Sequence, residues 1–362
     1  MELIASAIAM GHISGDGTFT RQASAILEEI LGAARVLLTT SCTDALEMSA
    51  ILSGVGPGDE VIVPAFTFVS GVNAFVTRGA TPVFADIRRD TLNIDERSIE
   101  PLLSDRTRVI APVHYAGVGC EMEALLALAS RRGATVIEDN AHGLFGCWRG
   151  RPLGTFAPMA ALSFHETKNI NCGEGGALIL NDASLVERAE IIREKGTNRS
   201  RFFRGLVDKY TWVDIGSSYL PSDMLAAYLV GQLEQRHEIQ AKRKRVWIRY
   251  HDALDPWATR HGIGLPFIPA DATQPYHMFY LIMPSLADRE SLIAHLRDRG
   301  IIATFHYIPL NTSPMAARFG SGKGQCPVAE EMSERLVRLP FYNNLSQDDQ
   351  SFVIDSIVEW RR

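Results

Sequence analysis

Short apolar runs alternate with longer amphipathic stretches through the first two thirds of the chain. Apolar runs typical of buried strands occur at residues 36–39, 60–63, 82–86, 109–114, 135–138, 160–164 and 177–180. Stretches with helical spacing occur at residues 43–52, 69–77, 122–132 and 185–194. Strands that alternate with helices predict an α/β fold, in which a mainly parallel sheet is covered on both faces.

The pattern changes in the last third of the chain. Residues 224–240 predict one long helix, which continues into the basic run 242–245. The simplest interpretation of that run is a solvated helix face. Beyond residue 249, apolar segments at 278–283, 292–299 and 303–307 indicate a smaller α+β unit. We therefore predict a large domain at residues 1–245 and a small C-terminal domain at residues 246–362.

Composition narrows the class of protein. The 362 residues are 46% hydrophobic and 22% charged, as in ordinary globular proteins, and the net charge of −6 argues against nucleic-acid binding. The five cysteines form no C-x-x-C pair, which argues against a zinc site or a disulfide framework. No long apolar run suits a membrane span, and the first residues lack the basic segment of a signal peptide. We expect a cytoplasmic protein with no membrane partner.

Lys168 does most to define the chemistry. It follows the predicted strand at residues 160–164 and precedes the glycine-rich turn at residues 173–176. Lysines are rarely buried unless they are paired or chemically used. A lysine in this place can form an imine with pyridoxal phosphate (PLP). An exposed lysine in a surface loop is the alternative.

Asp139 is the second candidate. It ends the apolar strand at residues 135–138, where an ionised group is costly without a partner. Open parallel sheets bind ligands at the carboxyl ends of their strands. A carboxylate there can keep the pyridine nitrogen of PLP protonated, because it favours the charged form of the ring. A helix N-cap is the alternative role for this residue.

Other segments could complete a cofactor site. Residues 39–46 place hydroxyl groups and backbone amides at a predicted helix start, where a phosphate can bind, although capping alone would explain Ser41 or Thr43. An aromatic ring in the run at residues 66–68 could stack on the cofactor or could pack in the core. His142 could contact the phenolic oxygen of the cofactor. No two histidines have metal-site spacing, so we expect no metal centre.

Together these motifs resemble the DegT-type sugar-nucleotide aminotransferases, which are PLP enzymes of the aspartate-aminotransferase fold, fold type I. The resemblance is carried by residues 41–46, 64–69, 112–117, 138–139, 163–169 and 173–177. Further runs resemble the branch of the family that makes dTDP-4-amino-4,6-dideoxygalactose. They are residues 193–200, 202–205, 208–212, 214–220 and 305–310.

The resemblance implies a role for each matching residue. Lys168 would be the Schiff-base lysine, and Asp139 would be the partner of the pyridinium nitrogen. The further cofactor contacts would be the backbone amides of Thr43 and Asp44, the hydroxyl of Ser163, the ring of Phe68 and the side chain of His142. The family forms homodimers with active sites at the interface, where residues 216–220, with Ser218 among them, would reach the phosphate held by the neighbouring subunit.

The resemblance also implies substrate contacts. The diphosphate of a nucleotide sugar needs cations, and the basic loop beside residues 216–220 supplies Arg199, Arg201, Arg204 and Lys209. An ordinary basic loop is the alternative. Tyr307, in the run at residues 305–310, would be a further substrate contact.

Several positions depart from the family pattern. Many relatives carry asparagine and arginine where this chain has Ser218 and Leu220. Asn140 replaces a small residue beside Asp139, and Asn311 stands where many relatives have a histidine. The segment before Gly15 is shorter than usual.

The expected reaction moves an amino group from L-glutamate to the 4-keto carbon of dTDP-4-dehydro-6-deoxy-D-glucose and gives dTDP-4-amino-4,6-dideoxy-D-galactose. One alternative is another nucleotide-linked keto-sugar, either a 3-keto sugar or a UDP-linked one. The other is a non-catalytic regulatory protein of the same fold. A related dehydratase branch carries histidine in place of the lysine, and Lys168 argues against it.

Overall fold

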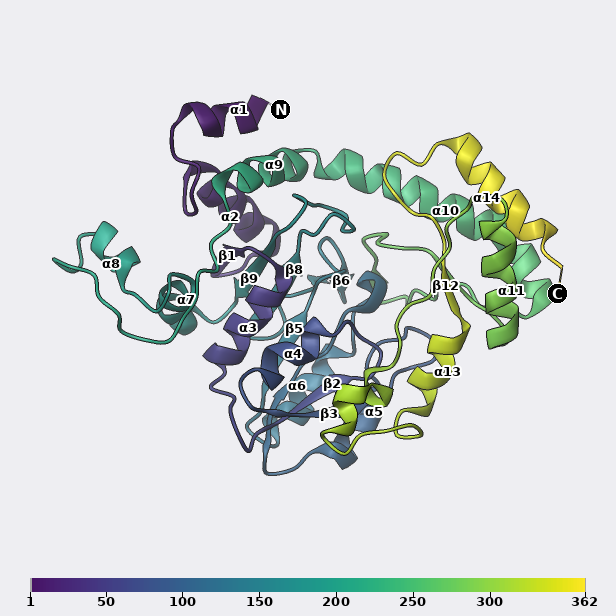
Figure 1. The fold of residues 1–362 in the computed structure, drawn as a ribbon, viewed down its shortest axis with the longest axis horizontal. Helices are drawn as coiled ribbons and strands as arrows, with labels where there is room; N and C mark the ends of the chain where they lie inside the picture. Colours follow the sequence, from purple (N-terminus) through teal and green to yellow (C-terminus); the bar gives the residue numbers. More distant parts are fainter. Residues whose placement is uncertain (1, 362) are drawn as a thin grey trace.

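A seven-stranded sheet forms the centre of the protein in the computed structural model, which describes residues 2–361 (Figure 1). In spatial order the strands are β1 (Arg35–Thr39), β9 (Gly176–Leu180), β8 (Met159–Ser163), β5 (Thr135–Asp139), β4 (Thr107–Ile110), β2 (Glu60–Pro64) and β3 (Thr81–Ala85). β9 runs antiparallel to β1 and β8, and the other pairs are parallel. The predicted mainly parallel sheet is confirmed, and every strand except β9 ends at the same edge.

Both faces of the sheet are buried. Along β1, Leu37 belongs to one hydrophobic cluster, while Val36 and Leu38 belong to the cluster on the opposite face. This alternation follows from the two-residue period of a strand. Helices that contribute to the first cluster are α3 (Cys42–Leu52), α4 (Ser70–Val76) and α7 (Val186–Arg193). Helices on the other face are α2 (Thr18–Leu31), α5 (Glu96–Ile99), α6 (Met122–Ser130) and α9 (Asp223–Glu234).

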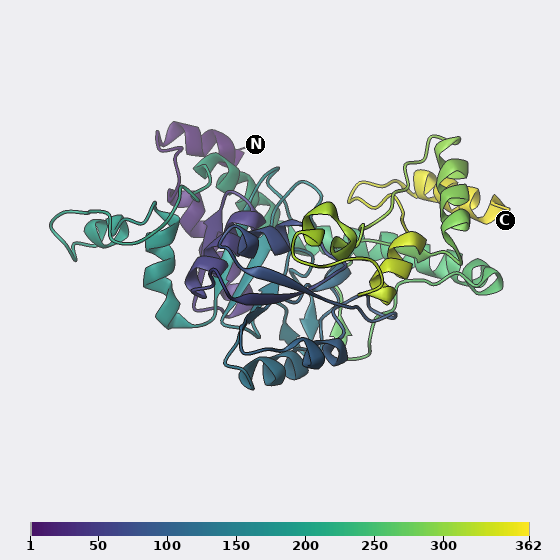
Figure 2. The same cartoon turned by 60° about the horizontal axis from the view of Figure 1, so that its bottom comes forward.

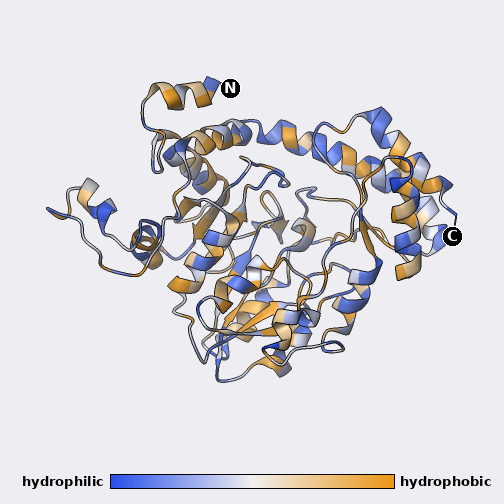
Figure 3. Cartoon of the chain, viewed as in Figure 1, coloured by the Kyte–Doolittle hydropathy of each residue, from blue (hydrophilic) through white to orange (hydrophobic). Residues whose placement is uncertain are grey.

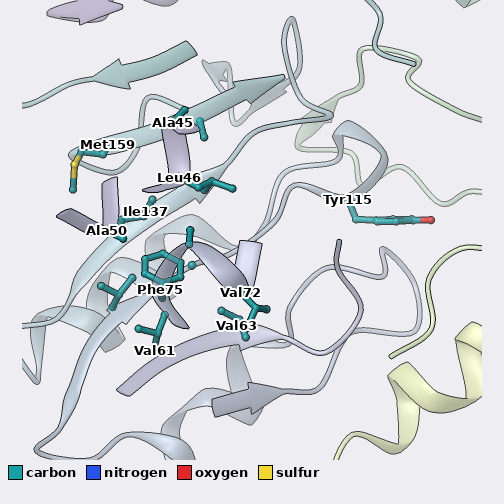
Figure 4. Close-up of a cluster of buried hydrophobic side chains, with 14 of the residues drawn as sticks. Ala45, Leu46, Ala50, Val61, Val63, Val72, Phe75, Tyr115, Ile137 and Met159 are labelled. Atoms are coloured by element: carbon teal, nitrogen blue, oxygen red, sulfur yellow. The ribbon is translucent and has the colours of Figure 1, made fainter. Parts of the chain in front are cut away.

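The cluster beneath α3 and α4 supports the edge where the strands end. Figure 4 shows Phe75 of α4 among Val61 of β2, Leu46 of α3 and Ile137 of β5, with Tyr115 extending away from them. Figure 3 shows hydrophobic residues along the central strands, and alternating polar and hydrophobic residues on the surrounding helices. This packing fixes the starts of α3 and α4 relative to the carboxyl end of β5.

The prediction of one helix over residues 224–240 is wrong. α9 ends at Glu234, and a second helix, α10 (Arg236–His261), begins two residues later. Gln235 leaves the helical conformation with ψ of 6°, and the Arg236 side chain donates a hydrogen bond to the Leu233 carbonyl (3.0 Å). A side chain that satisfies a terminal carbonyl stabilises a helix end.

The basic run 242–245 is only partly solvated. Lys244 and Arg245 are exposed, but Arg243 is 3% exposed. Its guanidinium donates to the carbonyls of Tyr276 and His277 and to the side chain of Asn343. A buried charge needs such partners. Arg243 therefore holds residues 276–277 against α10 and does not belong to a solvated face.

The C-terminal part packs around its own hydrophobic cluster, which extends from Val246 to Trp360. The main elements of this part are β11 (Tyr280–Ile282), α11 (Leu286–Arg297), α13 (Pro327–Arg335), β12 (Leu336–Arg338) and α14 (Gln347–Glu359). The buried apolar residues of α13 belong instead to the first cluster of the central sheet. The apolar segment at residues 303–307 forms an isolated bridge between Thr304 and Arg338. The proposed boundary at residue 245 falls inside the continuous helix α10, and it remains a prediction.

Short elements complete the described chain. They are α1 (Glu2–Ala9), β6 (Cys147–Trp148), β7 (Arg151–Pro152), α8 (Arg199–Phe203), β10 (Ala272–Thr273), α12 (Pro314–Ala317) and the 3₁₀ helices η1 (Glu100–Leu102), η2 (Tyr115–Gly117), η3 (Ala183–Leu185) and η4 (Leu310–Thr312). α8 and its flanking loops extend away from the sheet in both views (Figures 1 and 2). None of the helices in residues 2–361 has the length and apolarity needed to cross a bilayer.

Candidate active site

A cavity of about 550 Å³ lies at the sheet edge where the parallel strands end. Five segments that follow strands β1, β2, β4, β5 and β8 contribute to its lining, and the C-terminal part closes the opposite side. Parallel strands bring distant segments together in this way, because their carboxyl ends share one edge. The volume is typical of a site for a cofactor or a small substrate.

Lys168 lines this cavity, in the loop after β8. Its amide donates to the His165 carbonyl (2.9 Å), and the Phe164 amide donates to Gly175 (2.8 Å), so the lysine loop is tied to the glycine-rich turn. Gly173 in that turn has a φ of +85°, a conformation that favours glycine. Burial lowers the pKa of Lys168 to about 8. The lysine is therefore held inside the cavity and is not an exposed loop residue.

Asp139 also lines the cavity, at the last position of β5. One of its oxygens accepts the Ala141 amide (3.0 Å), so the carboxylate does form a local turn contact. Burial raises the pKa of Asp139, and the nearby Lys168 opposes that change. A buried carboxylate in this position is stabilised by a positively charged partner.

The start of α3 faces the cavity. Ser41, Cys42 and Thr43 all line it, and the Ser41 hydroxyl caps the helix by accepting the Asp44 amide (3.1 Å). The amides of Cys42 and Thr43 precede Asp44, at a helix start where no intrahelical acceptor exists. Capping and an anion site therefore coexist here. Asp44 itself does not line the cavity, and its predicted phosphate contact remains a prediction.

The two aromatic residues of the run at residues 66–68 lie in different environments. Phe66 is 1% exposed and packs in the core, whereas the ring of Phe68 lines the cavity and is 57% exposed. Between them, the Thr67 hydroxyl is buried without a hydrogen-bond partner among the described residues. An exposed ring and an unsatisfied hydroxyl on one wall are suited to a ligand that stacks and accepts a hydrogen bond.

Ser163 and Tyr307 line the same cavity, as does His142. The His142 ring accepts the Ala116 amide (3.3 Å) and stacks on His277, with the ring centroids 4.3 Å apart. Burial and the charge of Lys168 hold the pKa of His142 well below its usual value. The ring is therefore neutral at physiological pH.

The sequence analysis missed several cavity residues, among them the polar residues His277, His306 and Arg338. His277 is bonded to the Asn169 side chain (2.8 Å), and His306 to the Tyr115 hydroxyl (2.9 Å). They come from the C-terminal part of the chain. The rule that ligands bind where parallel strands end does not predict that this part reaches the sheet edge. Two local signals were present: His306 stands beside Tyr307 in the run at residues 305–310, and a charged residue interrupts the apolar run at residues 336–339.

Ser218, Arg199 and Arg204 line a second cavity, of about 1070 Å³. Arg199 pairs with Glu194 (3.0 Å), and Arg204 pairs with Glu190. Lys209 is exposed and lines neither cavity, whereas Tyr307 lies in the first one. Within a single chain, the predicted cationic contacts are therefore not brought to the cavity that holds Lys168.

Two departures from the family pattern have structural explanations. The Asn140 amide group donates to the Leu153 carbonyl (2.8 Å) beneath the cavity. The Asn311 side chain is fully buried and donates to Gly322 and to the Glu330 carboxylate (2.8 Å). Neither side chain lines the cavity, and each one ties its own segment to a neighbouring part of the chain.

Known proteins resemble this chain over nearly its full length. Residues 1–358 match the model of the DegT/DnrJ/EryC1/StrS aminotransferase family. The spore coat polysaccharide biosynthesis protein SpsC of Bacillus subtilis is 32% identical, over 90% of this chain and 85% of that protein. The dTDP-3-amino-3,4,6-trideoxy-alpha-D-glucose transaminase of Streptomyces venezuelae is 33% identical, over 88% and 80%.

Solved structures share the fold. The putative sugar aminotransferase Spr1654 from Streptococcus pneumoniae, in its PMP form, superimposes with a TM-score of 0.91 at 25% identity. The match covers 98% of this chain and 94% of that one. The predicted fold class is confirmed.

Proposed function

The chain belongs to the DegT/DnrJ/EryC1/StrS aminotransferase family, and from this premise we propose that it aminates the 4-keto carbon of dTDP-4-dehydro-6-deoxy-D-glucose. L-glutamate would supply the amino group, and dTDP-4-amino-4,6-dideoxy-D-galactose would be the product. The coarser activity is that of a PLP-dependent sugar aminotransferase. The observation that carries the proposal is the presence of Lys168 and Asp139 in one cavity beside a helix start.

The residues of the cavity fit PLP. Among the described residues the Thr67 hydroxyl is a buried donor without a partner, and the amides of Cys42 and Thr43 lie at the start of α3, where a phosphate can bind. A Cβ on Gly176 would lie 2.3 Å from the backbone of Ser41, so only glycine allows β9 to support this helix start so closely. When bound, PLP supplies an aldehyde carbon that carries the amino group and a ring that accepts electrons.

Lys168 and Asp139 would perform complementary tasks. Because the pKa of Lys168 is lowered to about 8, part of its Nζ is neutral at physiological pH and can act as a nucleophile. The same nitrogen would take and return the proton of the carbon that gains or loses the amino group. Asp139 would hold a proton on the ring nitrogen, because a buried carboxylate stabilises a cation beside it.

The other cavity residues would orient the ligands. Phe68 presents its ring for stacking, Ser163 offers a hydroxyl beside the helix start, and His142 offers a neutral imidazole nitrogen. Tyr307 lies against Phe66, with ring centroids 5.7 Å apart, and would contact the substrate. Tyr307 is half-buried at the cavity wall, and the ring of Tyr115 behind it is fully buried.

A homodimer would supply the remaining contacts. Ser218 lines the second cavity, and the preceding loop exposes apolar rings, including Trp212 at 77% exposure. Exposed apolar side chains of this size are typical of a contact surface. In the proposed dimer, Ser218 would reach the phosphate of the partner's cofactor. Arg199, Arg204 and Lys209 would then be candidates for the diphosphate of the sugar nucleotide.

A 3-keto sugar nucleotide is the second candidate substrate. It is favoured by the relative from Streptomyces venezuelae, whose name specifies a 3-amino sugar. The catalytic pair Lys168 and Asp139 would serve either position, because the sugar only has to present a different carbon to the same nitrogen. Surface polysaccharide assembly is the expected pathway, in line with the name of the Bacillus relative.

Product analysis would test these candidates. The purified protein with PLP and L-glutamate would be given 4-keto and 3-keto dTDP-sugars and a UDP-linked 4-keto sugar, and the products identified by NMR. We expect the galacto-configured 4-amino product from the dTDP-4-keto sugar, and none with the Lys168→Ala variant. Preferred turnover of another sugar would reject the proposed substrate. No turnover of any sugar, with glutamate leaving the absorbance of bound PLP unchanged, would favour the regulatory alternative.

A further inference from the structure

Arg338 occupies the wall of the cavity that the C-terminal part provides. It is the last residue of β12, where its backbone pairs with Tyr280 of β11 and forms a bridge with Thr304. The Arg338 amide donates to the Thr304 carbonyl (2.7 Å), so its backbone is fixed on both sides. Its side chain is half-buried and lines the cavity, together with Leu339 and Phe341 after it.

The guanidinium of Arg338 lacks an acidic partner. Within residues 2–361, no carboxylate lies within 4.0 Å of it, and it forms no side-chain hydrogen bond. Nearby arginines are satisfied: Arg335 pairs with Glu331, and Arg243 donates to backbone carbonyls. A half-buried guanidinium presents a planar fork of donors that fits a carboxylate or a phosphate. Arg338 is therefore suited to an anionic ligand that enters the cavity.

The phosphate of the cofactor has its own site elsewhere. The start of α3 and Ser163 belong to the sheet side of the cavity, whereas Arg338 belongs to the opposite wall with His277 and His306. Asp139 and Glu174 also line the cavity, but neither forms an ion pair with Arg338. The anion that Arg338 is suited to bind is therefore different from the phosphate of the cofactor.

The position of Arg338 relative to Lys168 narrows the choice of anion. Arg338 and Lys168 line the same cavity, and the positive charge of Arg338 contributes to lowering the pKa of Lys168, after the larger effect of burial. In an amino acid, the α-carboxylate is bonded directly to the carbon that loses the amino group. In a nucleotide sugar, the ring separates the keto carbon at position 4 from the diphosphate. A guanidinium in the same cavity as the reacting nitrogen therefore suits the amino acid better.

We propose that Arg338 binds the α-carboxylate of the amino donor and thereby selects amino acids as donors. This inference rests on the proposed aminotransferase function. The guanidinium would hold the carboxylate by two parallel hydrogen bonds and so orient the adjacent carbon toward Lys168. The keto acid product keeps the same carboxylate, so Arg338 would also hold it until it is released.

Binding of unreactive ligands would test this role without turnover. Glutarate, which carries the carboxylates of the donor but no amino group, and dTDP would each be titrated into the PLP-loaded protein by calorimetry. In Arg338→Gln we expect the Kd of glutarate to rise about 30-fold and that of dTDP to stay within about twofold, since a charged hydrogen bond is lost only to the carboxylate. Arg338→Lys should give an intermediate rise, because an ammonium cannot form the fork.

Control measurements distinguish loss of carboxylate binding at Arg338 from misfolding, and from failure of the proposed aminotransferase function. Arg335→Gln, three residues earlier and outside the cavity, should leave both Kd values unchanged, and every variant should keep the absorbance band of bound PLP. Weaker dTDP binding with unchanged glutarate binding would assign Arg338 to the diphosphate and overturn the inference, as would two unchanged Kd values. Failure of wild-type protein to aminate any sugar would instead reject the proposed function, and the glutarate titration would still report on Arg338.

Discussion

The imidazole rings of His142 and His277 stack with their centroids 4.3 Å apart and their planes inclined by 21°. His142 follows β5 of the central sheet, whereas His277 precedes β11 in the C-terminal part. The contact therefore joins the two walls of the cavity. Burial, followed by the charge of Lys168, holds the pKa of both rings well below the usual value, so the two rings can stack without charge repulsion.

Acid should destabilise the cofactor-free protein through these rings. The folded-state pKa values of His142, His277 and His306 lie below the unfolded value, so the unfolded chain binds more protons as the pH falls through about 6.5. Each ring should reduce the free energy of unfolding by about 1.4 kcal/mol per pH unit below that point. Urea denaturation at pH 7, 6 and 5 would measure the slope. The His277→Gln variant takes up one proton fewer on unfolding, so its unfolding free energy should change less steeply with pH, by about 1.4 kcal/mol per pH unit. An unchanged slope would contradict the lowered pKa of His277.

Lys168 should be unusually reactive in the cofactor-free protein. Its amine, with a pKa lowered to about 8, loses its proton more than two pH units below an ordinary lysine, and only the neutral form reacts with an acylating reagent. Mass spectrometry of protein labelled between pH 6 and 11 should therefore give a midpoint near 8 for this peptide.

Two variants test how neighbouring charges shift the pKa of Lys168. Asp139→Asn removes a negative charge that favours the ammonium form, and should lower the labelling midpoint of Lys168 further. Arg338→Gln removes a positive charge that disfavours it, and should raise the midpoint. Shifts in the same direction for both variants would show that these charges do not act on Lys168 as the structure indicates.

Thr67→Val should separate cofactor binding from stability. The wild-type hydroxyl is buried without a partner among residues 2–361, so its removal should leave the free energy of unfolding of the cofactor-free protein unchanged or raise it by up to about 1 kcal/mol. PLP affinity should fall about fivefold to tenfold, because one hydrogen bond to the ligand is lost. Equilibrium dialysis and urea denaturation would measure the two effects. Thr67→Ser, which keeps the hydroxyl, should retain the affinity, and a loss there as well would point to packing.

Gly176→Ala should displace the start of α3. A Cβ at residue 176 would meet backbone atoms of Ser41 and Cys42 at 2.3–2.4 Å, closer than real contacts allow. We expect the protein to lose about 1–3 kcal/mol of stability through strain and to bind PLP at least about tenfold more weakly. Gly322→Ala is the matched control, because a Cβ there meets nothing within 4 Å. Wild-type affinity in Gly176→Ala would mean that the helix start does not hold the phosphate.

The central sheet, and the half of the cavity that lies on it, could be predicted from the amino-acid sequence. Strand and helix periods are local properties, and the carboxyl ends of parallel strands must share one edge, so Lys168 and Asp139 could be placed together from the sequence pattern. Capping at Ser41 and the glycine turn after Lys168 are equally local.

Other features were decided by tertiary structure alone. The break at Gln235, the burial of Arg243 and the division of Phe66 and Phe68 between core and cavity each depend on what packs against the residue, which periodicity cannot show. His277, His306 and Arg338 reach the cavity because the C-terminal part folds back over the sheet edge. Contacts between residues so far apart in the chain depend on packing between the two parts, and local patterns of apolar and polar residues carry no information about them.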